Sequence, residues 1–305
     1  MKYGPYYPVS DLKWEDKEQK IDEIFSDWTF CQVYEANSKY IYDEGTGTYK
    51  KYWDASKTNW NGFVGITGDE DIMARDLDLT KNTIYFNTIT FNIYPMLSTP
   101  GIEEFIMDFH KLKMKEEAEG MIIDMRGNVG GYNLDRQYLF GDLFSEPHIF
   151  GYEKNKTGAG RFDYSLEFPL YIYPEAEYFN NEFSSISSKP VVVVTNSGSG
   201  SNAEMVVFMV RSIEKGGQVG SKTFGSTGTI IANIFAVNSG VFSIGNYIKV
   251  ESSPYGRLYD ANHVSHESVG LVPDEGYEVR FSLEDFNIGK DLRLNTAFQW
   301  IRDNR

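Results

Sequence analysis

Cysteine, positive charge and long apolar runs are scarce in this sequence of 305 residues. The single cysteine, Cys31, excludes an internal disulfide and cannot by itself make a metal cluster. Lys and Arg number 29 against 44 Asp and Glu, and the net charge of −15 argues against a nucleic-acid or anionic-membrane partner. No apolar run approaches the about 18 residues that a membrane-spanning helix needs. The first residues also lack the apolar core of a signal peptide.

What is present indicates a folded α/β protein. Apolar residues make up 41% of the chain and aromatic residues 15%, which is the composition of a globular domain. We expect a small, mainly helical N-terminal segment at residues 1–80 and an α/β core at residues 81–305. The acidic run at residues 68–71 is interpreted as a solvated surface. Residues 54–59 lack the glycine that a calcium loop requires. We expect no metal ion and no organic cofactor.

Strands alternate with helices along the core, and short turns follow the strands. The apolar periodicity predicts a helix within residues 11–40 and then a regular series of elements. The series consists of a strand at 83–93, a helix at 102–112, a strand at 121–125, a helix at 133–144, paired strands at 161–173, a strand at 191–194 with a helix after it, strands at 218–223 and within 229–250, a hairpin at 255–264 and a closing helix around 297–301.

Three glycine-rich turns each follow a predicted strand directly. They occupy residues 126–131, 197–203 and 225–228. In α/β folds such turns gather at one edge of the sheet, where ligands bind. We therefore expect the three turns to meet at a functional site.

Two chemistries, and a purely structural turn, are compatible with the middle segment. Residues 198–203 fit the dinucleotide pattern G-x-G-x-x-G/A, but the next strand ends without the acidic residue that would hold a ribose. Acyl transfer is the stronger interpretation, because a serine at a helix start can attack a carbonyl while backbone N–H groups hold the oxyanion. The spacing leaves open whether Ser197, Ser199 or Ser201 attacks.

Four segments, in this order, resemble the signature motifs of the tail-specific, or C-terminal processing, serine peptidases. They are residues 122–131 (IIDMRGNVGG), 199–204 (SGSNAE), 219–225 (VGSKTFG) and 266–274 (HESVGLVPD). The resemblance implies a crotonase-like β/α core. It also implies hydrolysis of peptides or unfolded proteins through an acyl-enzyme, in a periplasm or cell envelope.

The same resemblance assigns roles to particular residues. The nucleophile of the family is the serine three places before the glutamate, here Ser201. The oxyanion hole uses the residue after the nucleophile, here Asn202, and a glycine of the R-G-N-x-G-G loop, here Gly130 or Gly131.

The general base departs from the family pattern. Bacterial members carry a lysine where this chain has Ser226, and a serine cannot act as a general base. Lys222 is expected at the surface. Tricorn-like members use a histidine on the strand that corresponds to residues 84–91, where this chain has none. Glu267 resembles their supporting glutamate, so Ser226 and Glu267 are candidates for a supporting polar network.

Two further expectations follow. Of the four histidines, we expect His110 and His148 to lie in a helix and a loop, whereas His263 and His266 adjoin Glu267 and could replace the base. Residues 41–82 are too few for the PDZ domain that many family members insert there.

The competing hypothesis is a pseudopeptidase that binds a peptide or envelope ligand in the same cleft without cleaving it.

Overall fold

The computed structural model describes the greater part of the chain after residue 117 and separate pieces before it. The described residues are 40–43, 48–51, 63–66, 83–88, 91, 94, 106–107, 109–110, 113–114, 116, 118–174, 188–230, 241–244, 248–251, 255–280 and 291–305. The helix predicted within residues 11–40 lies outside them, apart from residue 40. The predicted helix at 102–112 is helical where it is described, at residues 106–107 and 109–110.

The core is a five-stranded sheet in the order β3-β4-β5-β8-β9. Its strands are β3 (Phe63–Ile66), β4 (Thr83–Asn87), β5 (Gly120–Asp124), β8 (Val191–Thr195) and β9 (Gly216–Gly220). Only β3 is antiparallel to its neighbour, and the other four strands run parallel. A parallel sheet needs both faces covered, which explains why the sequences of β5 and β8 are almost entirely apolar and fully buried.

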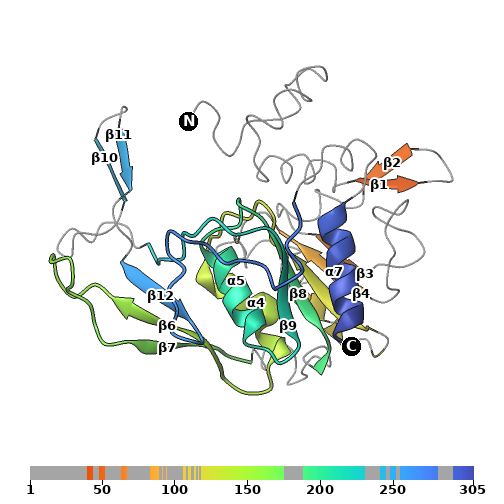
Figure 1. Ribbon diagram of the computed structural model, residues 1–305, viewed down its shortest axis with the longest axis horizontal. Helices are drawn as coiled ribbons and strands as arrows, with labels where there is room; N and C mark the ends of the chain where they lie inside the picture. The colour runs from red at the N-terminus through yellow and green to blue at the C-terminus, as the bar shows by residue number, and fades with distance from the viewer. Residues whose placement is uncertain are drawn as a thin grey trace.

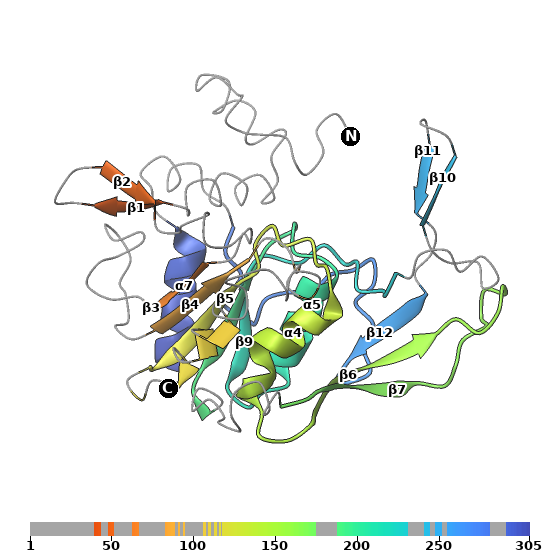
Figure 2. The same cartoon turned by 180° about the vertical axis from the view of Figure 1, so that it is seen from behind.

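Helices cover the two faces of this sheet (Figure 1, Figure 2). Helices α4 (Asn133–Phe140) and α5 (Asn202–Arg211) lie on one face, and α7 (Leu292–Asp303) lies on the other. Side chains alternate between the faces along each strand. Val191 and Val193 pack in the cluster that includes α5, whereas Val192 and Val194 pack with α7. The sheet is thus the middle of three layers.

A second, antiparallel sheet has the order β12-β6-β7. It contains β6 (His148–Asn155), β7 (Phe168–Ile172) and β12 (Gly256–Asp260). Two further hairpins pair β1 (Tyr40–Asp43) with β2 (Thr48–Lys51) and β10 (Val241–Ile244) with β11 (Ile248–Glu251). A 3₁₀ turn, η3 (Gly141–Leu143), follows α4.

Two expectations for this sheet were wrong. His148 does not lie in a loop but begins β6. The predicted hairpin at 255–264 is a single strand, β12, whose partner is β6, far away in the sequence. The segment after β12 is only a tight turn, in which the Asp260 amide donates to the Val264 carbonyl over 3.0 Å. Local alternation identified the strand but not its long-range partner.

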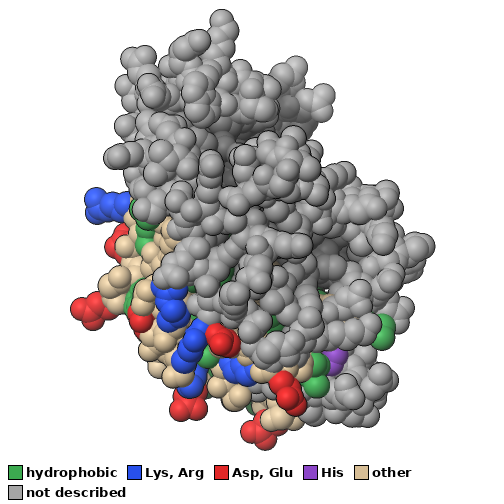
Figure 3. All heavy atoms as spheres, turned by 90° about the vertical axis from the view of Figure 1, so that its right-hand side faces the viewer, with side chains coloured by type: hydrophobic (Ala, Val, Ile, Leu, Met, Phe, Trp, Pro, Cys, Tyr) green, Lys and Arg blue, Asp and Glu red, His purple; other side chains and the backbone are tan. Residues whose placement is uncertain are grey.

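The described surface beside α7 is charged. Acidic and basic side chains lie next to one another there (Figure 3), and Arg305 forms an ion pair with Glu119. In the described part of the chain, no helix is both long enough and apolar enough to cross a bilayer.

A buried ion cluster ties the start of the first glycine turn to α7. The guanidinium of Arg126 contacts the carboxylates of Asp124 at 2.6 Å and Asp291 at 2.8 Å, and all three side chains are at most 1% exposed. Tyr85 donates its hydroxyl to Asp124 over 2.7 Å. Asp291 also caps α7 by accepting from the Leu294 amide. One arginine therefore links strand β5, the glycine turn and the closing helix.

We expect Arg126→Met to lower the free energy of unfolding by about 3–5 kcal/mol, because it leaves two buried carboxylates without their cation. Chemical denaturation measures this change. Arg211→Met is the matched control, because the Arg211–Asp274 pair is about a third exposed and an exposed pair contributes about 0–1 kcal/mol. Equal losses in the two variants would show that the buried cluster is not a principal support.

Candidate active site

Ser201 stands at the N-cap of α5, on a sharp turn directly after β8. Its backbone angles, φ 54° and ψ −122°, lie in a region that residues other than glycine rarely adopt. Such a conformation costs on the order of 1–3 kcal/mol and persists only where the surroundings enforce it. The side chain is half-buried. A strained serine at the start of a buried helix is a candidate nucleophile.

The other two serines of this turn have different surroundings. Ser199 is fully buried; its hydroxyl donates to the Met125 carbonyl over 2.8 Å and accepts from the Asn196 amide. The Ser197 hydroxyl is buried in the turn. Ser201 is the serine that faces the first glycine turn.

The three glycine turns meet, as their positions in the sequence predicted. The Gly200 amide donates to the Asn128 carbonyl over 2.9 Å, and the Ser201 amide donates to the Ser226 carbonyl over 3.1 Å. Gly130 approaches the serine so closely that a Cβ on it would lie 2.5 Å from the Cβ of Ser201. The φ of Gly130 is +95°, so both space and conformation require glycine here.

The first turn is fixed to the chain on its other side. The Phe91 amide donates to the Gly130 carbonyl and the Tyr132 amide donates to the Phe91 carbonyl, which forms a parallel bridge between Phe91 and Gly131. In a bridge of this register, Gly131 directs its own N–H away from Phe91. Asn128 adds a further hydrogen bond to the Thr88 carbonyl.

The amides near Ser201 differ in what they bind. The Gly130 amide is occupied, because it donates to Asn128 Oδ1 over 2.8 Å. The amides of Gly131 and Asn202 have no acceptor among the described residues. Two backbone donors therefore remain available beside the serine, one on each turn.

The dinucleotide alternative does not fit these contacts. The amides of Gly198, Ser199, Gly200 and Ser201 all donate to protein acceptors. A pyrophosphate would need those N–H groups, and within the described residues 198–203 Asn202 alone has an amide without a protein acceptor. Moreover, no group of three His, Cys, Asp or Glu residues in the described part of the chain could hold a metal ion.

The carboxylate of Glu204 joins the serine turn to the third glycine turn. Its Oε1 accepts from the Thr223 hydroxyl at 2.5 Å and the Gly225 amide at 2.9 Å. Its Oε2 accepts from the amides of Ser226 at 2.8 Å and Ser201 at 3.2 Å. Burial raises the pKa of Glu204, and the four hydrogen bonds oppose this rise. The side chain is fully buried, and its hydrogen bonds hold the serine turn and the third turn together.

Ser226 and Glu267 lie along the third turn. The Ser226 hydroxyl is beside Gly200, where a Cβ would lie 2.9 Å from it. Glu267 accepts from the Thr227 hydroxyl at 2.9 Å and from the Gly228 amide at 2.8 Å. Glu267 thus holds the residues that follow Ser226, and it has no recorded contact with Ser201 itself.

The described histidines are engaged elsewhere. His263 pairs with Glu167, and His266 with Asp260. The other two histidines are also hydrogen-bonded away from Ser201: His148 to the Ser212 hydroxyl, and the buried His110 to the Asp142 carboxylate. Within the part of the chain that the structure describes, no histidine or lysine is hydrogen-bonded to Ser201.

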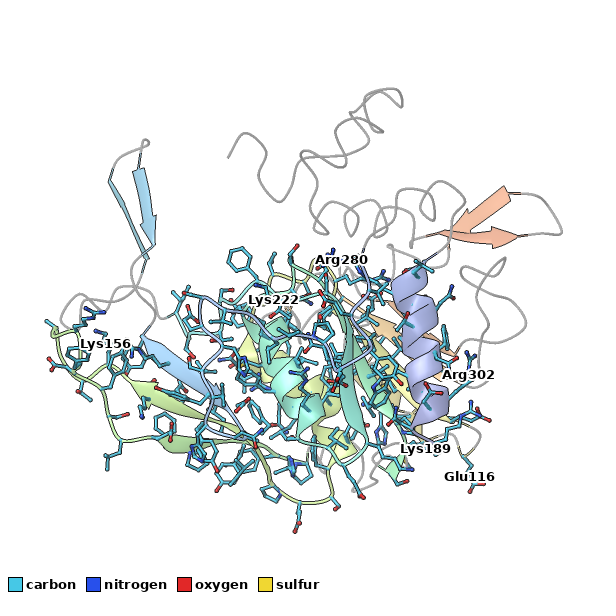
Figure 4. The ribbon with its side chains drawn as sticks, in the orientation of Figure 1. Glu116, Lys156, Lys189, Lys222, Arg280 and Arg302 are labelled. Carbon is cyan, nitrogen blue, oxygen red and sulfur yellow. The ribbon has the colours of Figure 1, made fainter. Side chains whose placement is uncertain are left out.

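Lys222 is exposed, as expected. It lies on the side of the molecule where β8 and β9 end, whereas Lys189 and Glu116 lie at the opposite end (Figure 4). Its aliphatic stem packs near Gly270.

Arg136 is a site residue that no sequence pattern identified. Its guanidinium donates to Asn202 Oδ1 over 2.6 Å and lies 4.5 Å above the ring of Phe150. The Asn202 side chain in turn donates to the Tyr132 carbonyl over 2.8 Å. Arg136 lies outside all four motifs, so no sequence pattern marked it. Glu204 and Asn128 do lie within motifs, and their roles could have been suspected there.

Comparison with known proteins agrees with these motifs. The family model for peptidase family S41 matches residues 87–275. A carboxyl-terminal-processing protease from Synechocystis sp. is 26% identical over 171 residues, which are 55% of this chain and 34% of that protein. The tricorn protease of Thermoplasma volcanium is 21% identical over 246 residues, which are 79% of this chain and 20% of that protein. The chain thus spans about a third or less of these relatives.

A solved structure shares the fold. A protein from Parabacteroides merdae, described as a candidate peptidase, superposes with a TM-score of 0.56 over 97% of this chain and 91% of that one, at 19% identity. The family model covers more than half of the chain, including all three glycine turns. The chain belongs to peptidase family S41.

Proposed function

We propose that this protein is a serine peptidase that cleaves peptides or unfolded proteins, with Ser201 as its nucleophile. The observation that carries the proposal is the strained Ser201 at the N-cap of α5, facing a glycine turn and two free amides. Membership of family S41 supports the reaction class.

The reaction would run in two halves. Ser201 Oγ attacks the peptide carbonyl carbon, and its proton leaves for an acceptor. The C–N bond then breaks, the amine departs with a proton, and an ester to Ser201 remains. Water attacks this ester and releases the new carboxyl end of the peptide, which returns the serine to its starting state.

Two backbone amides would hold the oxyanion, those of Asn202 and Gly131. Of the two glycines that the motif leaves open, Gly131 is favoured because the Gly130 amide already donates to Asn128. A donor of this kind is typically worth about 2.7–4 kcal/mol in the transition state. Gly130 instead lets the turn approach Ser201.

The supporting network consists of residues that fix the turns. Glu204 binds the serine turn and the third turn together, and Glu267 holds the segment after Ser226. We therefore assign Ser226 and Glu267 to positioning, and no described residue to the general base.

The missing base favours one alternative, a pseudopeptidase that binds a peptide or envelope ligand. The supporting observation is that no described lysine or histidine is hydrogen-bonded to Ser201. A peptidase without a positioned base would lose about 10²–10⁴-fold in rate.

Three coarser features belong to the same proposal. We assign residues 81–305 to the peptidase core, of the crotonase-like type, and residues 1–80 to an N-terminal segment from which β3 joins the core sheet beside β4. The match of the family model from residue 87 supports this division. We propose a periplasmic or cell-envelope location, in line with a lipoprotein from Streptococcus agalactiae among the similar structures.

Fluorophosphonate labelling tests the nucleophile. We expect the wild-type protein to label and to cleave an unfolded protein substrate, and Ser201→Ala to do neither, because Ser201 is the one serine of the described turn 197–203 whose partly exposed side chain lies beside the proposed oxyanion donors. Ser199→Ala is the matched control and should still label if the protein remains folded. Wild-type protein that neither labels nor cleaves would favour the pseudopeptidase.

We expect Glu204→Gln to slow labelling of Ser201 and to lower the free energy of unfolding by about 1–3 kcal/mol. The new amide N–H₂ would face backbone donors, which leaves buried hydrogen-bond donors unpaired. Denaturation and labelling rates measure the two effects. Glu214→Gln, an exposed change just after α5, should stay within about 0.5 kcal/mol of wild type.

Ser226→Lys tests the missing base directly. A lysine there starts beside Gly200, next to Ser201, and we expect it to raise the labelling rate about 10²–10⁴-fold if wild type has no base. The double variant Ser201→Ala/Ser226→Lys controls for labelling of the new lysine. If the single variant is no faster than wild type, the protein already has a base or the lysine does not reach the serine, and the pH profile of wild-type labelling distinguishes these cases.

A further inference from the structure

Arg136 is a cation without a matching anion, next to the residue that follows the nucleophile. The side chain is half-buried on α4, and its recorded contacts are the Asn202 side-chain oxygen and the face of Phe150. No carboxylate of the described residues pairs with it. By contrast, Arg126 and Arg211 are each paired with aspartates.

The exposed Arg161 and Arg257 also lack a carboxylate partner among the described residues, but Arg136 is half-buried, where a guanidinium loses part of its hydration. Acidic residues outnumber basic ones by 44 to 29, so carboxylates are plentiful. A guanidinium presents five N–H donors in a planar fork, and the bond to Asn202 uses only one direction of it. Burial without a counter-ion lowers the pKa of Arg136 to about 10, still high enough for the group to be charged at neutral pH.

The position of Arg136 places the charge at the candidate site. Asn202 supplies a proposed oxyanion donor through its backbone, and the guanidinium contacts the side chain of that same residue. Tyr132, one helical turn before Arg136, is half exposed and packs against Tyr94 at a centroid distance of 6.1 Å. The cation thus contacts the residue that supplies a proposed oxyanion donor, and an exposed aromatic pair lies one helical turn away along the chain.

We propose that Arg136 binds a carboxylate of the peptide substrate, and that this contact determines specificity. A planar guanidinium suits a carboxylate because two parallel N–H···O bonds can form. The carboxylate could be the free C-terminus of the substrate or an acidic side chain near the scissile bond. This inference rests on the proposed function, because it assumes that a peptide occupies the cleft.

The experiment measures binding in the Ser201→Ala background, so that cleavage is not needed. The probes are fluorescein-labelled peptides of alanine and leucine in matched pairs, read by fluorescence anisotropy. In the first pair, one peptide ends in a free carboxylate and the other in a carboxamide. In the second pair, both peptides end in a carboxamide, and one has an internal Glu where the other has Gln.

We expect at least one carboxylate peptide to bind about 10- to 100-fold more tightly than its neutral partner, the range of a hydrogen bond to a charged group. Arg136→Gln should bring that ratio close to one, and Arg136→Lys should retain part of it. Arg161→Gln, the same charge change at an exposed site, should leave the ratio intact. The pair that shows the effect identifies the source of the carboxylate.

Other outcomes separate this inference from the proposed function. A ratio near one before mutation, or a ratio that survives Arg136→Gln, overturns the carboxylate site. Equal weakening of acidic and neutral peptides does so as well, because Arg136 would then only position Asn202. If the carboxylate preference depends on Arg136 but wild-type protein neither labels nor cleaves, the carboxylate site stands and the peptidase proposal is rejected. If wild-type protein cleaves acidic and neutral peptides equally well, the peptidase proposal stands and the carboxylate site is rejected.

Discussion

The carboxylate of Glu204 is the contact on which the geometry of the site depends most. Ser201 adopts a conformation that costs on the order of 1–3 kcal/mol, and isolated turns relax from such strain. Glu204 opposes this relaxation, because one buried side chain accepts from the serine turn, from two amides of the third turn and from the Thr223 hydroxyl just before that turn. The net hydrogen-bond gain, about 1.5–3 kcal/mol for each bond to a charged group, is large enough to offset the strain.

The first glycine turn also holds Ser201 in its strained conformation. The first turn is anchored below by the buried Arg126 cluster and at its side by Phe91, so Gly130 meets Ser201 from a fixed position. A site supported in this way does not need to reorganise when charge develops, which is how fixed dipoles stabilise a transition state. The strain at the serine therefore persists because several separate buried contacts hold its neighbours in place.

The sequence predicted the parts of the fold that depend on local pattern. The apolar run of β8, the stripe of α5 and the three glycine turns were all identifiable, and the turns meet as expected. It did not predict the pairing of β12 with β6 or the contact of Arg126 with Asp291, because no local pattern encodes partners so far apart. The same reason explains why Arg136 was missed, since only the packing of α4 against α5 brings it to Asn202.

On the proposed assignment of the site, the absence of a positioned base would remove only part of the rate enhancement. Two oxyanion donors, at about 2.7–4 kcal/mol each, would still lower the barrier by several kcal/mol without any proton acceptor. A positioned base contributes 10²–10⁴-fold, or roughly 2.7–5.4 kcal/mol. The turns around Ser201 could thus support slow acyl transfer to water or to a reactive probe even where peptide turnover is weak. Because the same turns would also bind a peptide carbonyl in the ground state, a cleft that loses its base keeps its capacity to bind. On this assignment, loss of the base would slow peptide cleavage by about 10²–10⁴-fold while the turns, and with them the capacity to bind a peptide, stay unchanged.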